Sequence, residues 1–425
     1  MGGRVRLRVG LAMAAAAVAV TGVVAVATIT ATGSPPRTAG GVGPKLTSLP
    51  PATSPRPVTT TVPPTTLAPV PVGVPDEPDP EPAPPAAGVP DGFAGRGIVV
   101  VAAGGADVAT SPNGPTIVRA REGIVLPALE RRRGWIRILT TCDEEAWVRT
   151  TDVAAGEAAD PAVVGPGFEI ADAVVVVDPG HGGSNIGTAS PDGSMAEKDV
   201  NVDISRRLRD LLTSSHTVDW ESGTIFTGAE VPAVANVVLT RVGAGADADY
   251  EAGLTFRATL ANALGAHAMV SIHNNAGWEI DLDMPGSDVY YQSQVAESRR
   301  FAELLVEEFR RSFGGFEADW VGAIETGAKS RLSPRDGSSQ YYGILRQAEM
   351  PTVIAEGAYL SNASEAALLA TAAFRQAYAE AVYRALVRFL STDDVAAALS
   401  YPPVVWAGGA GSGDPQPGCT LPAQP

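Results

Sequence analysis

The chain has 425 residues, of which 47 are acidic and 31 are basic, so its formal net charge is −16. An acidic chain without a basic block cannot neutralise many phosphates, which argues against nucleic acid as a partner. Two cysteines and four histidines exclude a cysteine-only zinc site and a disulfide-dense scaffold. Any metal site must therefore combine histidines with carboxylates.

Residues 1–33 are predicted to be a membrane anchor or a signal peptide. Arg4, Arg6 and Arg8 precede an uncharged, Ala/Val-rich run over 9–29. About 20 apolar residues can span a bilayer, and the basic flank would stay inside. We favour an uncleaved anchor, with the membrane as a partner, over a cleaved secretory signal. Either alternative predicts that the remainder is extracytoplasmic.

A disordered linker is predicted over 34–93, where 18 of the 35 prolines lie. Such Pro- and Thr-rich sequence favours extended conformations and has no apolar face. It would hold the following parts of the chain away from the membrane.

A small all-β barrel is predicted over 95–160. Gly134-Trp135 and Ala146-Trp147 resemble bacterial Src-homology-type domains of wall enzymes, although both tryptophans could equally well fill the core. The resemblance implies that such a barrel would bind wall peptide or brace the domain that follows it. The expected strands are short and separated by turn residues: 98–101, 116–118, 123–126, 135–139 and 146–148.

An α/β domain with a mostly parallel sheet flanked by helices is predicted over 171–392. Short apolar runs alternate with helical patterns, and Asn362 to Glu365 has capping-box spacing before a long helix that ends near residue 390. The expected strands are 174–177, 268–272, 289–291 and 351–355, and the expected helices begin near residues 197, 254, 295 and 362.

Three polar side chains lie at the ends of apolar strands: His181, His273 and Glu356. Ligands of open α/β sheets bind beyond the carboxyl ends of the strands, and Glu197 at the next helix start could reach the same edge. Two imidazoles and one carboxylate form a known catalytic zinc set. A second carboxylate, Glu356, could then act as general base and acid.

Each candidate also has a structural interpretation. Glu197 could be an ordinary carboxylate at a helix N-terminus, His273 a satisfied strand-end histidine, and His181 part of a turn. No compact HExxH motif is present. His216 and His267 are assigned to structure, His216 in a loop and His267 at the start of a strand.

Five ordered motifs, with Arg257 and Ala261-Asn262 on the helix before the second histidine, resemble the zinc-dependent N-acetylmuramoyl-L-alanine amidases of bacterial cell-wall turnover. Asn185 and Ile186 replace the Asp and Pro that are frequent in that family. The five motifs are Val176-Val177-Asp178-Pro179-Gly180-His181-Gly182-Gly183, Glu197-Lys198-Asp199-Val200-Asn201, Leu239-Thr240-Arg241, Ser271-Ile272-His273 and Glu356-Gly357-Ala358-Tyr359-Leu360-Ser361-Asn362.

The resemblance implies a hydrolase of peptidoglycan that cleaves the amide between N-acetylmuramic acid and L-alanine during wall remodelling or cell separation. It implies that His181, Glu197 and His273 bind Zn²⁺ and that Glu356 is catalytic. The alternative is a non-catalytic wall-binding or regulatory protein with an inactive amidase fold.

A Gly/Pro-rich tail is predicted over 393–425. Cys142 and Cys419 could form a disulfide between the predicted barrel and this tail in an exported protein. Two unpaired thiols are the alternative.

Overall fold

The computed structural model describes most of the chain beyond residue 96. The predicted apolar segment (1–33) and linker (34–93) lie outside the described residues, as does part of the predicted tail. No helix within the described ranges is both long and apolar enough to cross a membrane. The described residues are 97–156, 158–159, 163–241, 250, 252–277, 286–316, 327–397, 400–407, 419 and 421–422.

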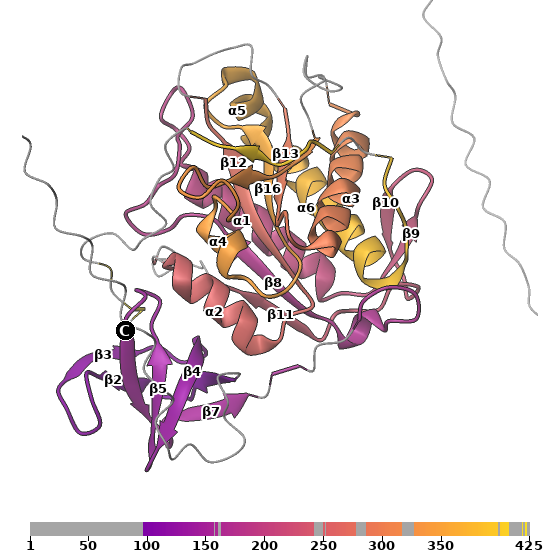
Figure 1. Cartoon of the computed structure of the whole chain (residues 1–425). Helices are drawn as coiled ribbons and strands as arrows, with labels where there is room; N and C mark the ends of the chain where they lie inside the picture. The colour runs from indigo at the N-terminus through magenta and orange to yellow at the C-terminus, as the bar shows by residue number, and fades with distance from the viewer. Residues whose placement is uncertain are drawn as a thin grey trace, which may run out of the picture. The chain divides into compact units, whose positions relative to one another are not determined.

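A seven-stranded antiparallel sheet occupies the first described part of the chain (Figure 1). The sequence predicted five of its strands and missed β2 and β7, whose alanine-rich segments have little β-propensity. Because β3 and β7 stand at the two ends of the strand order, closure into a barrel stays a prediction. The strands are β1 (Ile98–Val101), β2 (Ala106–Ala109), β3 (Thr116–Ala120), β4 (Val125–Arg132), β5 (Trp135–Leu139), β6 (Glu145–Arg149) and β7 (Val153–Gly156).

The two tryptophans of this sheet differ in burial. Trp135 is buried, with the Arg149 guanidinium 4.4 Å from its ring centroid. Trp147 is half-buried, with the Arg132 guanidinium 5.9 Å from its ring centroid. Core packing therefore accounts for Trp135, whereas Trp147 keeps an accessible part.

A second sheet of six strands has the order β11-β8-β12-β16-β13-β14. It is mixed, because β13 runs antiparallel to β16 while the other neighbours run parallel. Every residue of β8 is buried. Its continuous apolar run is typical of a strand that is covered on both faces. The strands are β8 (Val174–Pro179), β11 (Asn236–Leu239), β12 (Ala268–Asn275), β13 (Asp288–Tyr291), β14 (Gly327–Lys329) and β16 (Thr352–Tyr359).

Helices cover both faces of this sheet (Figure 1). Helices α1 (Glu197–Leu212), α3 (Ala296–Phe313) and α6 (Ala372–Ser391) share one hydrophobic cluster with alternate residues of the central strands. Helices α2 (Leu254–Leu264) and α4 (Gly343–Gln347) pack on the other face. The remaining elements are η1 (Ile170–Asp172), β9 (His216–Asp219), β10 (Thr224–Thr227), β15 (Arg331–Leu332), α5 (Ala363–Leu369) and β17 (Val404–Val405).

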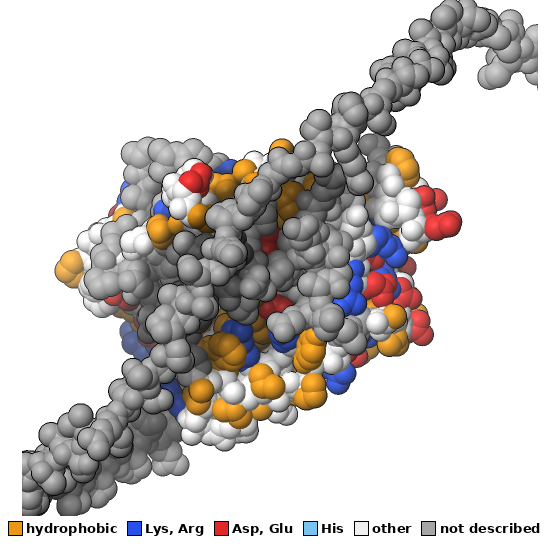
Figure 2. Space-filling view, turned by 90° about the horizontal axis from the view of Figure 1, so that it is seen from above, with side chains coloured by type: hydrophobic (Ala, Val, Ile, Leu, Met, Phe, Trp, Pro, Cys, Tyr) orange, Lys and Arg blue, Asp and Glu red, His pale blue; other side chains and the backbone are white. Residues whose placement is uncertain are grey.

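Acidic and basic side chains of the described residues lie interspersed on the face seen from above (Figure 2). Some charged side chains pair with each other, as do Arg207 Nε and Asp203 Oδ2, 2.8 Å apart. Among the described residues seen in this view, neither sign of charge forms one continuous patch.

The long helix predicted after Asn362 is wrong, because the structure has two helices there. Asn362 caps α5 by accepting hydrogen bonds from the backbone N–H groups of Ser364 and Glu365. Thr371 then starts α6 by accepting a hydrogen bond from Phe374 N–H. The predicted loop position of His216 is also wrong, since this residue opens β9.

Cys142 and Cys419 form a disulfide, with their Cα atoms 5.8 Å apart. The backbone N–H of Arg121 also donates to the carbonyl of Pro422, 3.0 Å away, and Leu421 is buried. The structure thus shows a disulfide rather than two unpaired thiols, and this disulfide ties the tail to the seven-stranded sheet.

The residue next to this disulfide, Asp143, caps helix α2. Its carboxylate accepts hydrogen bonds from Thr255 N–H at 3.2 Å and from Phe256 N–H at 2.6 Å. The N-cap residue of α2 is Gly253, which has no side chain to do this, and a Cβ there would overlap the Asp143 carboxylate. A residue distant in sequence therefore supplies the cap.

We expect Asp143→Ala to lower the free energy of unfolding by about 1 kcal/mol, because two N–H groups of α2 lose their acceptor. Urea unfolding followed by circular dichroism measures this. The matched control is Glu144→Ala, which removes the neighbouring exposed carboxylate and should change stability much less. Equal losses in the two variants would contradict the capping role.

Candidate functional site

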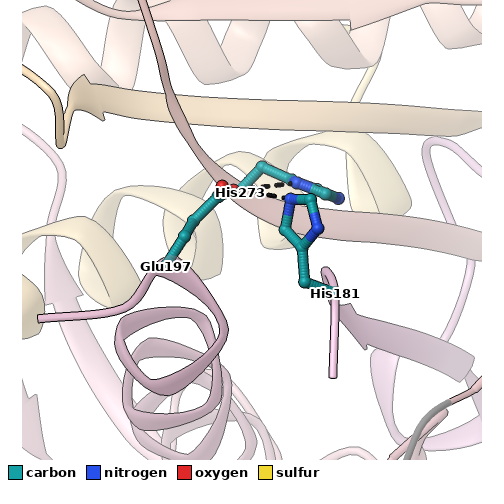
Figure 3. A group of neighbouring side chains, drawn as sticks. All are labelled: His181, Glu197 and His273. Carbon is teal, nitrogen blue, oxygen red and sulfur yellow. Dashed lines mark hydrogen bonds and ion pairs between the residues drawn. The ribbon is translucent and has the colours of Figure 1, made fainter. Parts of the chain in front are cut away.

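Glu197 lies between two imidazoles that come from different elements (Figure 3). Glu197 is the first residue of α1, His181 follows β8, and His273 lies on β12. The Glu197 Oε2 atom lies 3.0 Å from His181 Nε2, and Oε1 lies 3.1 Å from His273 Nδ1. One carboxylate thus joins the two histidines that the sequence singled out.

The Glu197 carboxylate is buried, at 4% exposure, but it is well supplied with donors. The backbone N–H of Thr188 donates to it at 3.0 Å and that of Asn274 at 3.1 Å. Burial alone would raise the pKa of Glu197, but the neighbouring His181 and His273 lower it. The carboxylate is therefore held in its ionised form.

His181 stands in an unusual backbone conformation, with φ at 63°. This left-handed region is uncommon outside glycine. Two neighbours hold it there: Asn185 Oδ1 lies 2.9 Å from His181 Nδ1, and Arg257 Nη2 donates to the His181 carbonyl at 2.5 Å. If Asn185 accepts from Nδ1–H, the other ring nitrogen is left as the ligand atom.

The buried carboxylate of Asp178 anchors the turn that carries His181. It accepts hydrogen bonds from Arg257 Nη1 at 2.5 Å, from Ser271 Oγ at 2.5 Å and from the Thr240 hydroxyl. Burial alone would raise the pKa of Asp178, but the positive charge of Arg257 and the two hydroxyl donors bring it below its ordinary value. Asp178 of β8 therefore joins α2, β12 and the residue after β11 in one cluster.

Two buried arginines hold the backbone of the same turn. Arg257 Nη1 donates to the carbonyl of Pro179 at 2.7 Å. Arg241 donates to the carbonyls of Pro179 at 3.0 Å and Gly180 at 2.9 Å. These bonds satisfy the carbonyls at the end of β8 and so fix the path of the turn.

Glycine is required at two positions around the imidazoles. A Cβ at Gly180 would overlap the His273 ring, and a Cβ at Gly187 would overlap the Glu197 carboxylate. Gly187 also has φ at +71°, which side chains rarely adopt. The glycines therefore leave the space in which the three site residues meet.

Glu356 lies on β16 beside His273 on β12 and opposite Asp288 on β13. Its Oε2 atom is buried and has no hydrogen-bond partner among the described residues. Burial, with the negative charges of Glu197 and Asp288, raises the pKa of Glu356 well above its ordinary value. A buried carboxylate oxygen without a partner, next to an imidazole cluster, marks a functional position.

His181, Glu197 and His273 could hold one metal ion. Their ligand atoms lie within 4.8 Å of one another. Two imidazole nitrogens and one ionised carboxylate are donors that metal hydrolases use, with a further position open to water or substrate. With Glu356 beside them, the arrangement is suited to hydrolysis with proton transfer.

The family profile described as N-acetylmuramoyl-L-alanine amidase matches residues 175–388. The chain belongs to the N-acetylmuramoyl-L-alanine amidase family. All four site residues predicted from the sequence lie inside the region that this amidase profile matches.

Relatives of known sequence and structure carry the same amidase name. An N-acetylmuramoyl-L-alanine amidase of Mycobacterium tuberculosis is 29% identical over 234 residues, which are 52% of this chain and 88% of the relative. The amidase AmiA of Escherichia coli is 26% identical over 244 residues, covering 51% and 75% of the two chains. The crystal structure of the amidase Ami1 of Mycobacterium smegmatis matches with 25% identity and a TM-score of 0.40, covering 52% of this chain and 98% of that chain.

The structure brings His181, Glu197, His273 and Glu356 together at one edge of the mixed sheet. His267 lies apart and accepts a hydrogen bond from Val174 N–H at 2.9 Å. Sequence reasoning gave no role to several residues that complete the site: Asp178, Asn185, Arg241 and Asp288. Asp288 stands directly before the β-prone residues 289–291, and this position in the sequence could have identified it as a candidate site residue.

Two glycines with the same backbone angle give a matched test of this geometry. Gly187 and Gly193 both have φ at +71°, but a Cβ at Gly193 would meet nothing within 4 Å. We expect Gly187→Ala to weaken the binding of a metal ion at this site by about 10- to 100-fold, because the methyl group displaces Glu197. Gly193→Ala should bear a similar backbone strain but keep the metal affinity of the wild-type chain. Competition titration against a chelating dye measures both, and equal affinities would contradict the packing around Glu197.

Proposed function

We propose that the chain is a zinc-dependent amidase that hydrolyses the bond between N-acetylmuramic acid and L-alanine in peptidoglycan. The observation that carries this proposal is the meeting of His181, Glu197 and His273 beside the unpartnered Oε2 of Glu356. Membership of the amidase family supports the substrate class.

His181, Glu197 and His273 would hold the zinc ion. The set fits because Glu197 is ionised and because Asn185 fixes the ring of His181 from its other nitrogen. Bound zinc acts as a Lewis acid on a carbonyl and makes a water molecule more acidic.

Glu356 would move the proton. Its Oε2 has no partner among the described residues and its pKa is raised by burial and by two neighbouring carboxylates. A carboxylate with a raised pKa both accepts a proton from the attacking water and gives it up to the leaving alanine nitrogen. In this step the C–N bond breaks while the hydroxyl group stays on the lactyl carbonyl carbon.

We further propose an extracytoplasmic location in which the apolar segment (1–33) anchors the chain and the linker (34–93) spaces it from the membrane. The Cys142–Cys419 disulfide suits an oxidising compartment. The β-rich module proposed over 95–160 would bind wall peptide or brace the amidase domain over 171–392.

Digestion of purified peptidoglycan by the full chain tests the proposed activity. We expect mass spectrometry to detect released peptides that begin with L-alanine, because only cleavage at the muramoyl amide produces them. Glu356→Gln should release none of these peptides and still bind zinc, since it keeps all three proposed ligands.

The matched control is Glu349→Gln, which removes an exposed carboxylate outside the site and should digest normally. Loss of zinc from Glu356→Gln would show that Glu356 has a different role. Stoichiometric zinc without any released peptide from the wild-type chain would instead favour a non-catalytic wall-binding protein.

A further inference from the structure

Arg331 of β15 lies among three aromatic rings. Its guanidinium carbon is 4.6 Å from the ring centroid of Tyr290, 5.8 Å from that of Tyr342 and 3.8 Å from that of Trp406. Stacking on aromatic rings fixes the plane of a guanidinium and leaves the N–H groups along its edge available.

The backbone around Arg331 is held from two sides. Strand β17 pairs with β15 so that Val404 lies beside Arg331, and Val404 N–H donates to the Ser330 carbonyl at 3.0 Å. Tyr341 N–H donates to the Arg331 carbonyl at 2.9 Å. Trp406 and β17 lie beyond residue 388, where the match to the amidase family ends. A segment outside the matched region therefore completes the aromatic enclosure of Arg331, which is formed by Tyr290, Tyr342 and Trp406.

Most donors of Arg331 are not used within the described residues. A guanidinium has five N–H groups, and Arg331 donates one hydrogen bond, to Tyr342 Oη at 2.5 Å. The nearby carboxylate of Asp288 pairs instead with Lys329 Nζ, 2.6 Å away. Arg331 is thus a fixed, half-buried cation without a carboxylate partner in the described part of the chain.

The aromatic enclosure of Arg331 lies close to Glu356, the proposed proton carrier. Asp288 and Tyr290 are two residues apart on β13, so their side chains lie on the same face of the sheet. Asp288 lies opposite Glu356 on β16. The positive charge of Arg331 partly opposes the rise in the pKa of Glu356, so the two groups lie within electrostatic reach of each other. A peptide that extends from a scissile bond at Glu356 toward Tyr290 would approach Arg331.

We propose that Arg331 binds a carboxylate of the substrate peptide, on the residue that follows L-alanine. This inference rests on the proposed amidase function. An extended residue spans at most about 3.6 Å, so the second residue carries its carboxylate about 7 Å from the scissile amide. A guanidinium held by stacked rings offers a carboxylate two parallel N–H donors with little loss of side-chain freedom.

Two synthetic substrates test the proposal: muramoyl-L-alanyl-glutamate with free carboxylates, and the same compound with both carboxylates as carboxamides. We expect the wild-type chain to prefer the free carboxylates. Arg331→Gln should lower kcat/KM for that substrate by about 10- to 100-fold, mainly through KM, since hydrogen bonds to a charged group are lost. The amide substrate should be little affected, and Arg331→Lys should restore part of the preference.

Arg335→Gln is the matched control, because Arg335 is an exposed cation on the same loop with no aromatic contact among the described residues; it should keep the wild-type preference. Trp406→Ala should reduce the preference, because one stacking ring is lost. Equal losses on both substrates in Arg331→Gln, or an unchanged preference, would overturn the inference while leaving the amidase activity established. A wild-type chain that cleaves neither substrate nor peptidoglycan would overturn the proposed function, and this inference with it.

Discussion

The candidate site depends on one buried ion pair, between Asp178 at the end of β8 and Arg257 on α2. Removing one partner of such a pair costs about 3–5 kcal/mol, because the other charge stays buried. Here both charges are satisfied, and Arg257 uses further donors on the carbonyls of Pro179 and His181. The same interaction that stabilises the sheet edge therefore fixes the turn from which one imidazole projects, so stability and site geometry are coupled.

Residues on both sides of the region that matches the amidase family contribute to this arrangement. Before it, Asp143 caps the helix that carries Arg257. After it, Trp406 encloses Arg331 near Glu356. Within the matched region lie the imidazoles, Glu197 and Glu356. The candidate site residues and Arg331 thus lie inside the matched region, whereas Asp143 and Trp406, which support them, lie outside it.

Much of the site could be predicted from the sequence because its residues stand at local signals, namely the ends of apolar strands and the start of an amphipathic helix. The supporting contacts could not, since the partners of Asp178 come from residues 62 to 93 positions away. The apolar pattern continues through the break before α6, so only the side-chain hydrogen bond of Thr371 reveals it. The direction of β13 was equally hidden, because residues 289–291 have the same local pattern in a parallel or an antiparallel strand.

Zinc K-edge X-ray absorption of the purified full chain tests the central claim most directly. The proposed site predicts one zinc ion per chain, with two imidazoles among nitrogen and oxygen ligands and no sulfur, since both cysteines are joined in a disulfide. Zinc well below one ion per chain, a single imidazole, or a sulfur ligand would contradict the assignment of His181, Glu197 and His273 as the metal centre.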